Sequence, residues 1–302
     1  MRVLVAVDGS SGSAEAVRQA GLLSSPDKDQ LALYYSPVAV NFKKSGLDAG
    51  LVGKARGSLA EAIFGEARPQ LPEPWRAKAE TIVGDEPARQ GVLHAAQTWK
   101  ADLIVVGARG LGPIKRMMLG SVSRSVTQSA TVPVLVAKKT PHKASGFRVL
   151  IPAEDCHHAR QFTTVLEQIT WPQDTSGTLL SVVQPMHAGE IPDWLEQRAR
   201  DPEIKHMAEA WANEHQQELQ AKRREMQESC DSLPWPWKTQ EPVILEGQPA
   251  EQILEAITAR NIDLLVIGAR GTNPLTRLLL GSTTAVVVAH APCSVLIVRQ
   301  KG

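Results

Sequence analysis

The sequence predicts an α/β fold made of two copies of one small domain. Three observations support this prediction. A length of 302 residues is typical of two domains. The stretch 107–121 reappears without a gap as 268–282, with glycine and serine at matching places. Short apolar runs alternate with longer helical patterns throughout, which is how a parallel sheet covered on both faces is encoded.

The repeat extends well beyond this central stretch. The two apolar runs that precede it start at Asp102 and Asp263, and the starts of the two copies align at Arg2 and Arg148. The polar segment 138–146 separates the copies, as expected of a linker. We therefore expect one domain over residues 1–140 and a second over 146–302, with an inserted helical segment near 190–235.

The apolar runs and helical patterns locate the expected elements. Strands are expected near 2–7, 30–36, 77–83, 102–106 and 133–137, and again near 147–152, 178–184, 239–245, 263–267 and 293–298. Helices are expected near 11–23, 51–69, 87–99 and 121–130, and near 203–231 within the insertion.

Composition excludes several classes of function. Because 33 basic residues balance 32 acidic ones, no strong field is expected to gather nucleic acid or an anionic membrane. The nearly uncharged stretch 278–298 is interpreted as a buried helix followed by a strand rather than a membrane span. Cys156, Cys230 and Cys293 form no CxxC pair, which favours a reducing cytoplasm and argues against a zinc site.

The repeated glycine loop is the main candidate site. Gly107 and Gly110 follow a hydrophobic strand, at the sheet edge where open α/β folds place their ligands. Gly120 and Ser121 then open a new helix, whose first N–H groups and positive dipole end are suited to phosphate oxygens. A plain capping arrangement is the alternative for one such loop, but two complete copies favour a ligand-related role.

Neither loop matches the common phosphate-binding fingerprints. The GxxxxGK[ST] pattern requires a lysine that is missing here, and the GxGxxG pattern is absent as well. Without that lysine, no obvious side chain stabilises charge on a transferred γ-phosphate. No Ser–His–Asp or Cys–His set can be assembled from the sequence, so no catalytic residue and no metal ligand are predicted.

The pattern Gly-x2-Gly-x9-Gly-Ser after a strand resembles the universal stress protein family. An opening strand that ends in Val7-Asp8-Gly9-Ser10 and a Gly-x-x-Pro segment at Gly84 add to the resemblance, which covers nearly the whole chain as a tandem pair. It implies an open five-stranded parallel sheet in each domain, of the Rossmann-like, adenine nucleotide alpha hydrolase-like type. It also implies bound ATP or a related nucleotide, and pairing of the two last strands across a pseudo-twofold axis.

The resemblance assigns roles to residues of the first copy. Asp8, next to Val7, would meet the adenosine part, because a carboxylate at a strand end accepts hydrogen bonds from ribose or adenine. Asp8 as a simple turn cap is the alternative. Arg109 could reach phosphate or pair with a surface carboxylate. Base-lining and phosphate-binding roles fall on Ser36, Val83, Gly107, Gly110, Gly120, Ser121 and Val122.

The second copy departs from this pattern. Glu154 aligns with Asp8, and Asp155 adds an acidic group where a nucleotide would sit, whereas Val183 would face the position of Ser36. We therefore expect the first site to bind more readily than the second. The second set consists of Glu154, Val183, Gly268, Arg270, Gly271, Gly281, Ser282 and Thr283.

Three functions follow as expectations. The first is a cytoplasmic ATP-binding, stress-response module, with the two domains paired and a further homodimer left open. The second is a slow ATP hydrolase that uses Ser121 and backbone amides around a Mg²⁺-bound triphosphate. The third is a scaffold with vestigial pockets, which acts through the helical segment 203–231.

Overall fold

The structure, a computed structural model, describes residues 1–37, 49–110, 119–139, 146–184, 202–234, 241–269 and 280–299. The first half contains β1 (Arg2–Ala6), α1 (Ser11–Leu22), β2 (Gln30–Tyr35), α2 (Ala49–Ala67), η2 (Arg68–Gln70), α3 (Glu73–Lys78), β3 (Glu80–Val83), α4 (Ala88–Thr98), β4 (Leu103–Gly107), α5 (Ser121–Ser129) and β5 (Val134–Ala137). The second half contains β6 (Phe147–Pro152), α6 (Cys156–Gln161), α7 (Thr163–Gln168), β7 (Thr175–Val183), α9 (Pro202–Ser232), β8 (Val243–Glu246), α10 (Pro249–Ala259), β9 (Leu264–Gly268), α11 (Ser282–His290) and β10 (Ser294–Val298).

One ten-stranded sheet runs through both halves, in the order β3-β2-β1-β4-β5-β10-β9-β6-β7-β8. Within each half the neighbouring strands are parallel. Along the sheet, the second half has the strand order of the first in reverse. The halves meet at β5 and β10, which pair antiparallel with Leu135 opposite Leu296. The predicted fold class is confirmed: two tandem α/β domains, each an open five-stranded parallel sheet with helices on both faces.

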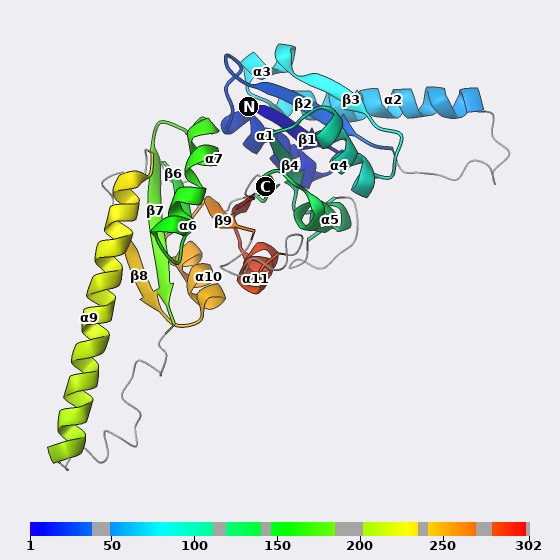
Figure 1. The fold of residues 1–302 in the computed structure, drawn as a ribbon. Helices are drawn as coiled ribbons and strands as arrows, with labels where there is room; N and C mark the ends of the chain where they lie inside the picture. Colours follow the sequence, from blue (N-terminus) through cyan, green and yellow to red (C-terminus); the bar gives the residue numbers. More distant parts are fainter. Residues whose placement is uncertain are drawn as a thin grey trace.

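Helices cover both faces of the sheet, which explains why its strands are continuous apolar runs (Figure 1). Val3 and Val5 in β1 point to the face covered by α1, α2 and α3, whereas Leu4 points to the face covered by α4 and α5. All three side chains are fully buried. The second half is arranged likewise, with α6, α7 and α9 on one face and α10 and α11 on the other.

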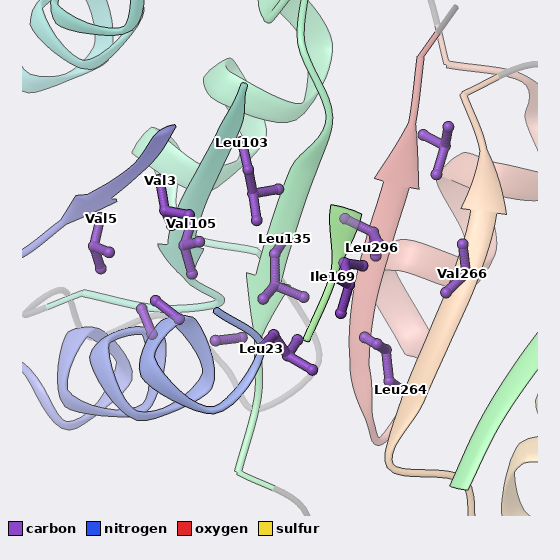
Figure 2. Close-up of a cluster of buried hydrophobic side chains, with 14 of the residues drawn as sticks. Val3, Val5, Leu23, Leu103, Val105, Leu135, Ile169, Leu264, Val266 and Leu296 are labelled. Atoms are coloured by element: carbon purple, nitrogen blue, oxygen red, sulfur yellow. The ribbon is translucent and has the colours of Figure 1, made fainter. Parts of the chain in front are cut away.

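The hydrophobic core is continuous across the junction of the two halves. Leu135 of the first half and Leu296 of the second lie side by side there, with Leu23 and Ile169 close to them (Figure 2). The Thr170 amide also donates to the Leu23 carbonyl at 3.1 Å, which joins a loop of each half.

The long helix α9 has 31 residues and fills the span where a helix near 203–231 was expected. It lies between the second and third strands of its half, which is the place that the 19-residue α2 takes in the first half. α9 packs along β7 and β8, and its N-terminal part extends past them (Figure 1). By position, α9 is therefore a lengthened counterpart of α2.

The apolar stretch 278–298 contains the short helix α11 and the buried strand β10. Within the described parts of the chain, no helix has the length and apolar character needed to cross a membrane.

Candidate functional site

A cavity of about 200 Å³ lies where the first half changes its direction of winding. The strand order reverses between β1 and β4, and ligands of open α/β sheets bind at such a point, beyond the carboxyl ends of the strands. The ends of β1, β2 and β4 and the first turn of α5 form the walls. The fold thus creates this cavity just where the chain carries Asp8 and its glycine loop.

Nine of the ten residues predicted for the first site line this one cavity: Val7, Asp8, Ser36, Gly107, Arg109, Gly110, Gly120, Ser121 and Val122. The tenth, Val83, does not. It ends the edge strand β3, is 52% exposed, and is not part of the cavity wall. Side chains from β2 and α4 form the apolar part of the wall that was expected from Val83.

Asp8 is held in place by the start of α1. Its Oδ1 accepts hydrogen bonds from the Ser10 amide at 3.0 Å and the Ser10 hydroxyl at 2.6 Å. Ser10 Oγ in turn caps α1 by accepting from the Ser13 amide at 3.1 Å. The turn between them has Gly9 at a φ of +79°, a conformation that glycine adopts without a steric cost. Asp8 is thus both part of a capping turn and a wall of the cavity.

The three glycines of the loop have different physical roles. A Cβ at Gly107 would lie 2.4 Å from the Gly12 carbonyl carbon, so this glycine lets β4 and α1 approach backbone to backbone. A Cβ at Gly110 would lie 2.3 Å from Asp8 Oδ2, so this glycine makes room for the carboxylate. A Cβ at Gly120 would find its nearest atom at 3.5 Å, an ordinary contact. An alanine at Gly120 would therefore fit against the backbone of residues 108–110 without a clash.

The start of α5 presents its amides to the cavity. Gly120 is the N-cap and makes no side-chain cap hydrogen bond, while its own amide donates to the Ala108 carbonyl at 2.8 Å. The next amides, of Ser121 and Val122, fall in the first turn, where a helix supplies no carbonyl of its own. Ser123 Oγ donates to the Gly107 carbonyl at 2.6 Å and so fixes the helix against the end of β4. Such a helix end attracts an anion.

Tyr34 and two residues of α4 complete the cavity wall on its apolar side. Tyr34, Ala88 and Val92 all line the cavity and were not among the predicted site residues. The Tyr34 hydroxyl lies against Gly84 and Gly91, where a Cβ would come within 2.0 Å and 2.2 Å of it. Burial raises the pKa of Tyr34 above its ordinary value. Gly84 and Gly91 lie far from Tyr34 in the chain, so the sequence carried no signal for this contact.

Ser36 ties the end of β2 to the segment before α4. Its hydroxyl donates to the Glu86 carbonyl, and the Glu86 carboxylate lies 2.6 Å from His94 Nδ1. This pairing holds the segment around Glu86 over the β2 side of the cavity. Ser36 therefore shapes the wall through its hydroxyl, as well as lining it.

The second half repeats the glycine framework. The Gly281 amide donates to the Ala269 carbonyl at 2.9 Å, and Thr284 Oγ1 donates to the Gly268 carbonyl at 2.8 Å, as Ser123 does to Gly107. Gly281 is the N-cap of α11, which begins at Ser282 and continues through Thr283. Arg270 and Gly271 lie outside the described residues.

The acidic residues of the second half are arranged differently. Asp155 takes the place of Ser10 as the N-cap, since it accepts from the His158 amide at 2.7 Å. Burial opposes ionisation of Asp155, but the hydrogen bonds and charge of His158 outweigh it and lower the pKa. Glu154 is exposed. The expected equivalence of Val183 to Ser36 is wrong. The pairing of β2 with β1 and of β7 with β6 matches Ser36 with Val182, whereas the pairing with β3 and β8 matches Tyr35 with Val183.

Among the described residues, no group of three or more His, Cys, Asp or Glu side chains is placed so that it could hold a metal ion. Of the side chains described along the cavity wall, one is a carboxylate, Asp8, and one is a guanidinium, Arg109. Hydroxyls and backbone amides supply the other polar groups of the wall. This set suits hydrogen bonding to a polar ligand more than metal coordination.

Comparison with known proteins shows which family the chain resembles. The Universal stress protein family model matches residues 1–138 and 191–299. Universal stress protein YxiE of Bacillus subtilis is 33% identical over 147 residues, 45% of this chain and 98% of YxiE. A universal stress protein of Mycolicibacterium smegmatis is 24% identical across 99% of this chain and 97% of its own length.

A solved structure covers the whole tandem arrangement. The crystal structure of a universal stress protein from Archaeoglobus fulgidus covers 100% of this chain, and 98% of its own chain is matched, with a TM-score of 0.59 at 18% identity. That similarity shows the fold. The family model, which matches residues in both halves, establishes that this chain belongs to the universal stress protein family.

Proposed function

We propose that this chain is a stress-response module that binds an adenine nucleotide, ATP in particular, in the cavity of its first half. The observation that carries the proposal is the meeting of two complementary features on one cavity. Asp8 offers a carboxylate to the hydroxyl and amino groups of a nucleoside, and the uncapped start of α5 offers amides to phosphates.

The residues present fit a nucleotide at this place. Tyr34 and Val92 provide an apolar wall for a base, and Ser36 lies beside them. Gly120 leaves the helix start without a side-chain cap, and the exposed Arg109 lies on the same cavity. Bound ATP would supply the polyanion, while the protein contributes positioning through its amides and Asp8. We assign no catalytic residue.

The domain organisation belongs to the same proposal. We propose that residues 1–140 and 146–302 form the two domains, and that the pairing of β5 with β10 keeps them together in solution. The free thiols Cys230 and Cys293 favour a reducing compartment, so we place the protein in the cytoplasm. We propose weaker nucleotide binding in the second half, because Asp155 is engaged as a helix cap there.

Two measurements test the proposal. Mass spectrometry of the protein purified without added nucleotide identifies any adenine nucleotide that stays bound, and calorimetric titration gives the Kd for ATP, ADP and AMP. We expect ATP to bind and Asp8→Asn to weaken binding at least tenfold. Asp27→Asn is the matched control, because it removes the same charge from a side chain that is 89% exposed and pairs with Lys78.

The alternatives make different predictions in the same experiments. Failure to bind ATP in titration would contradict the proposal and favour a scaffold. Phosphate release with Mg²⁺ at a turnover of minutes or faster, abolished by Gly120→Ala, would favour a hydrolase that uses Ser121 and the amides beside it.

A further inference from the structure

Helices α5 and α11 each join one glycine loop to the junction of the two halves. The N-cap of each helix is the last glycine of its loop, Gly120 or Gly281, and the helix ends just before the strand that pairs with the other half. Because β5 and β10 are antiparallel, the C-terminus of each helix lies beside the end of the other half's last strand.

Arg299, which follows β10 in the second half, caps α5 of the first half. Its Nη2 donates to the Thr127 carbonyl and, at 3.4 Å, to the Gln128 carbonyl. These two carbonyls belong to the last turn of α5, where a helix leaves its C=O groups without partners of its own. A cation at this end also complements the helix dipole.

Lys138, which follows β5 in the first half, makes the mirror contact. Its Nζ donates to the Val288 carbonyl at 3.0 Å and the Ala291 carbonyl at 2.6 Å, at the end of α11. Its backbone amide and carbonyl also both bond to Ser294 Oγ, at 3.1 Å each. Each half thus contacts the C-terminus of the helix that follows the other half's glycine loop.

Backbone hydrogen bonds join the end of each last strand to the glycine loop of the same half. In the first half the Ala108 amide donates to the Ala137 carbonyl at 2.9 Å, and the Gly120 amide to the Ala108 carbonyl at 2.8 Å. In the second half the Ala269 amide donates to the Val298 carbonyl at 2.9 Å, and Gly281 bonds to Ala269 in the same way. The residue before each cap, Ala137 or Val298, is therefore bonded to the glycine loop of its own half.

We propose that Arg299 is a positioning residue for the nucleotide site of the first half, so that the second half regulates the affinity of that site through α5. The inference rests on the proposed function. By symmetry, Lys138 does the same for α11 and the second loop.

The effect acts through the position of the helix rather than through direct charge. α5 has nine residues and is about 13 Å long, which exceeds the Debye length of about 8 Å at physiological salt. Arg299 therefore has little direct attraction for a phosphate at the other end. Amides that bind an anion must point at it accurately, so a helix that is held less firmly at its far end binds less well.

The test compares ATP affinity in folded variants by calorimetry. Arg299→Met is expected to raise the Kd about fivefold, equally at 0.15 M and 0.5 M NaCl, and Arg299→Lys to recover most of the loss. Arg76→Met is the matched control. Arg76 also donates to a backbone carbonyl, that of Leu71 at 3.0 Å, but far from α5 in the chain, and its loss should leave the Kd unchanged.

A second measurement uses the unaltered chain and so does not depend on how a variant folds. ATP is expected to slow hydrogen exchange at least twofold in the peptide that covers residues 293–299, as well as around the first site. Equal ATP affinity of Arg299→Met and wild type, or protection confined to the first half, would overturn this inference alone. No ATP binding by the wild type would overturn the proposed function and this inference with it.

Discussion

The carboxylate of Asp8 and the backbone of Gly110 lie against each other, so that a Cβ at Gly110 would be 2.3 Å from Asp8 Oδ2. Two residues that are far apart in the sequence thus depend on one another at the cavity. Gly110 leaves room for the carboxylate, and the carboxylate in turn excludes a larger residue at position 110.

Substitution of Gly110 by alanine is therefore predicted to act through Asp8. The new methyl group displaces the carboxylate, which is a flexible group, so folding should survive while ATP affinity falls about tenfold. Gly53→Ala is the control, since no atom lies within 4 Å of a Cβ there and helix α2 should gain about 0.5–1 kcal/mol. Calorimetry and thermal melting of both variants check the prediction. Unaltered ATP affinity in Gly110→Ala would count against a role for Asp8.

Gly107 and Gly120 are predicted to respond differently to alanine. At Gly107 the methyl group meets the fixed backbone of Gly12 at 2.4 Å, so Gly107→Ala should lose about 2 kcal/mol or more of stability. At Gly120 the nearest atom is 3.5 Å away, so that variant should lose at most about 1 kcal/mol, the usual penalty of alanine at an N-cap. Denaturant unfolding measures both. Similar losses at the two positions would contradict the separate roles of these glycines.

Ser123 is predicted to stabilise the loop through one hydrogen bond. Ser123→Ala leaves the Gly107 carbonyl without this donor and should cost about 1 kcal/mol, because a partly buried acceptor loses its partner. Ser129→Ala, at an exposed position of the same helix, should change stability by less than about 0.5 kcal/mol. Urea unfolding of the two variants compares them, and equal effects would argue against the hydrogen bond.

Lys138 is predicted to make stability depend on pH. Burial, with a smaller contribution from Arg109, lowers its pKa from 10.5 to about 8, against a weaker raising effect of Cys293. Between pH 8 and 10.5 the unfolded chain therefore binds more protons, and the free energy of unfolding rises with pH; below pH 8 the full cost of the buried charge is present.

The check is a comparison of unfolding at pH 7, 8 and 9. From pH 7 to 9 the wild type should gain about 1 kcal/mol relative to Lys138→Met, in which this titration is removed. The comparison also removes the titration of Cys293, which both proteins share. Parallel pH profiles would show that Lys138 is not buried as a cation at the end of α11.

Much of the fold could be predicted because the sequence contains an internal repeat, so that each half could be compared with the other. The repeat of 107–121 as 268–282 located the end of β4, the start of α5 and their counterparts. Buried strands are apolar on both faces and helices are not, so the order of elements followed from pattern alone. The offset of Val183 escaped prediction because β7 has nine residues and β2 has six.

The cavity was predicted in its polar part and less well in its apolar part. Glycines and Asp8 stand out in a sequence, whereas Tyr34 and Val92 look like ordinary core residues. Val83 was placed in the wall from the resemblance, but the last residue of an edge strand has no neighbour to enclose it. The caps by Lys138 and Arg299 depend on how β5 and β10 pair, and sequence pattern carries no signal for such a contact.

The central claim is that amides at the start of α5 bind phosphate beside Asp8. The most direct test follows the backbone amide resonances of Ser121, Val122 and Ser123 by nuclear magnetic resonance during titration with ATP and, separately, with adenosine. We expect ATP to shift these amides strongly, and adenosine, which lacks phosphate, to leave them nearly unchanged. Unshifted amides in the presence of saturating ATP would contradict it.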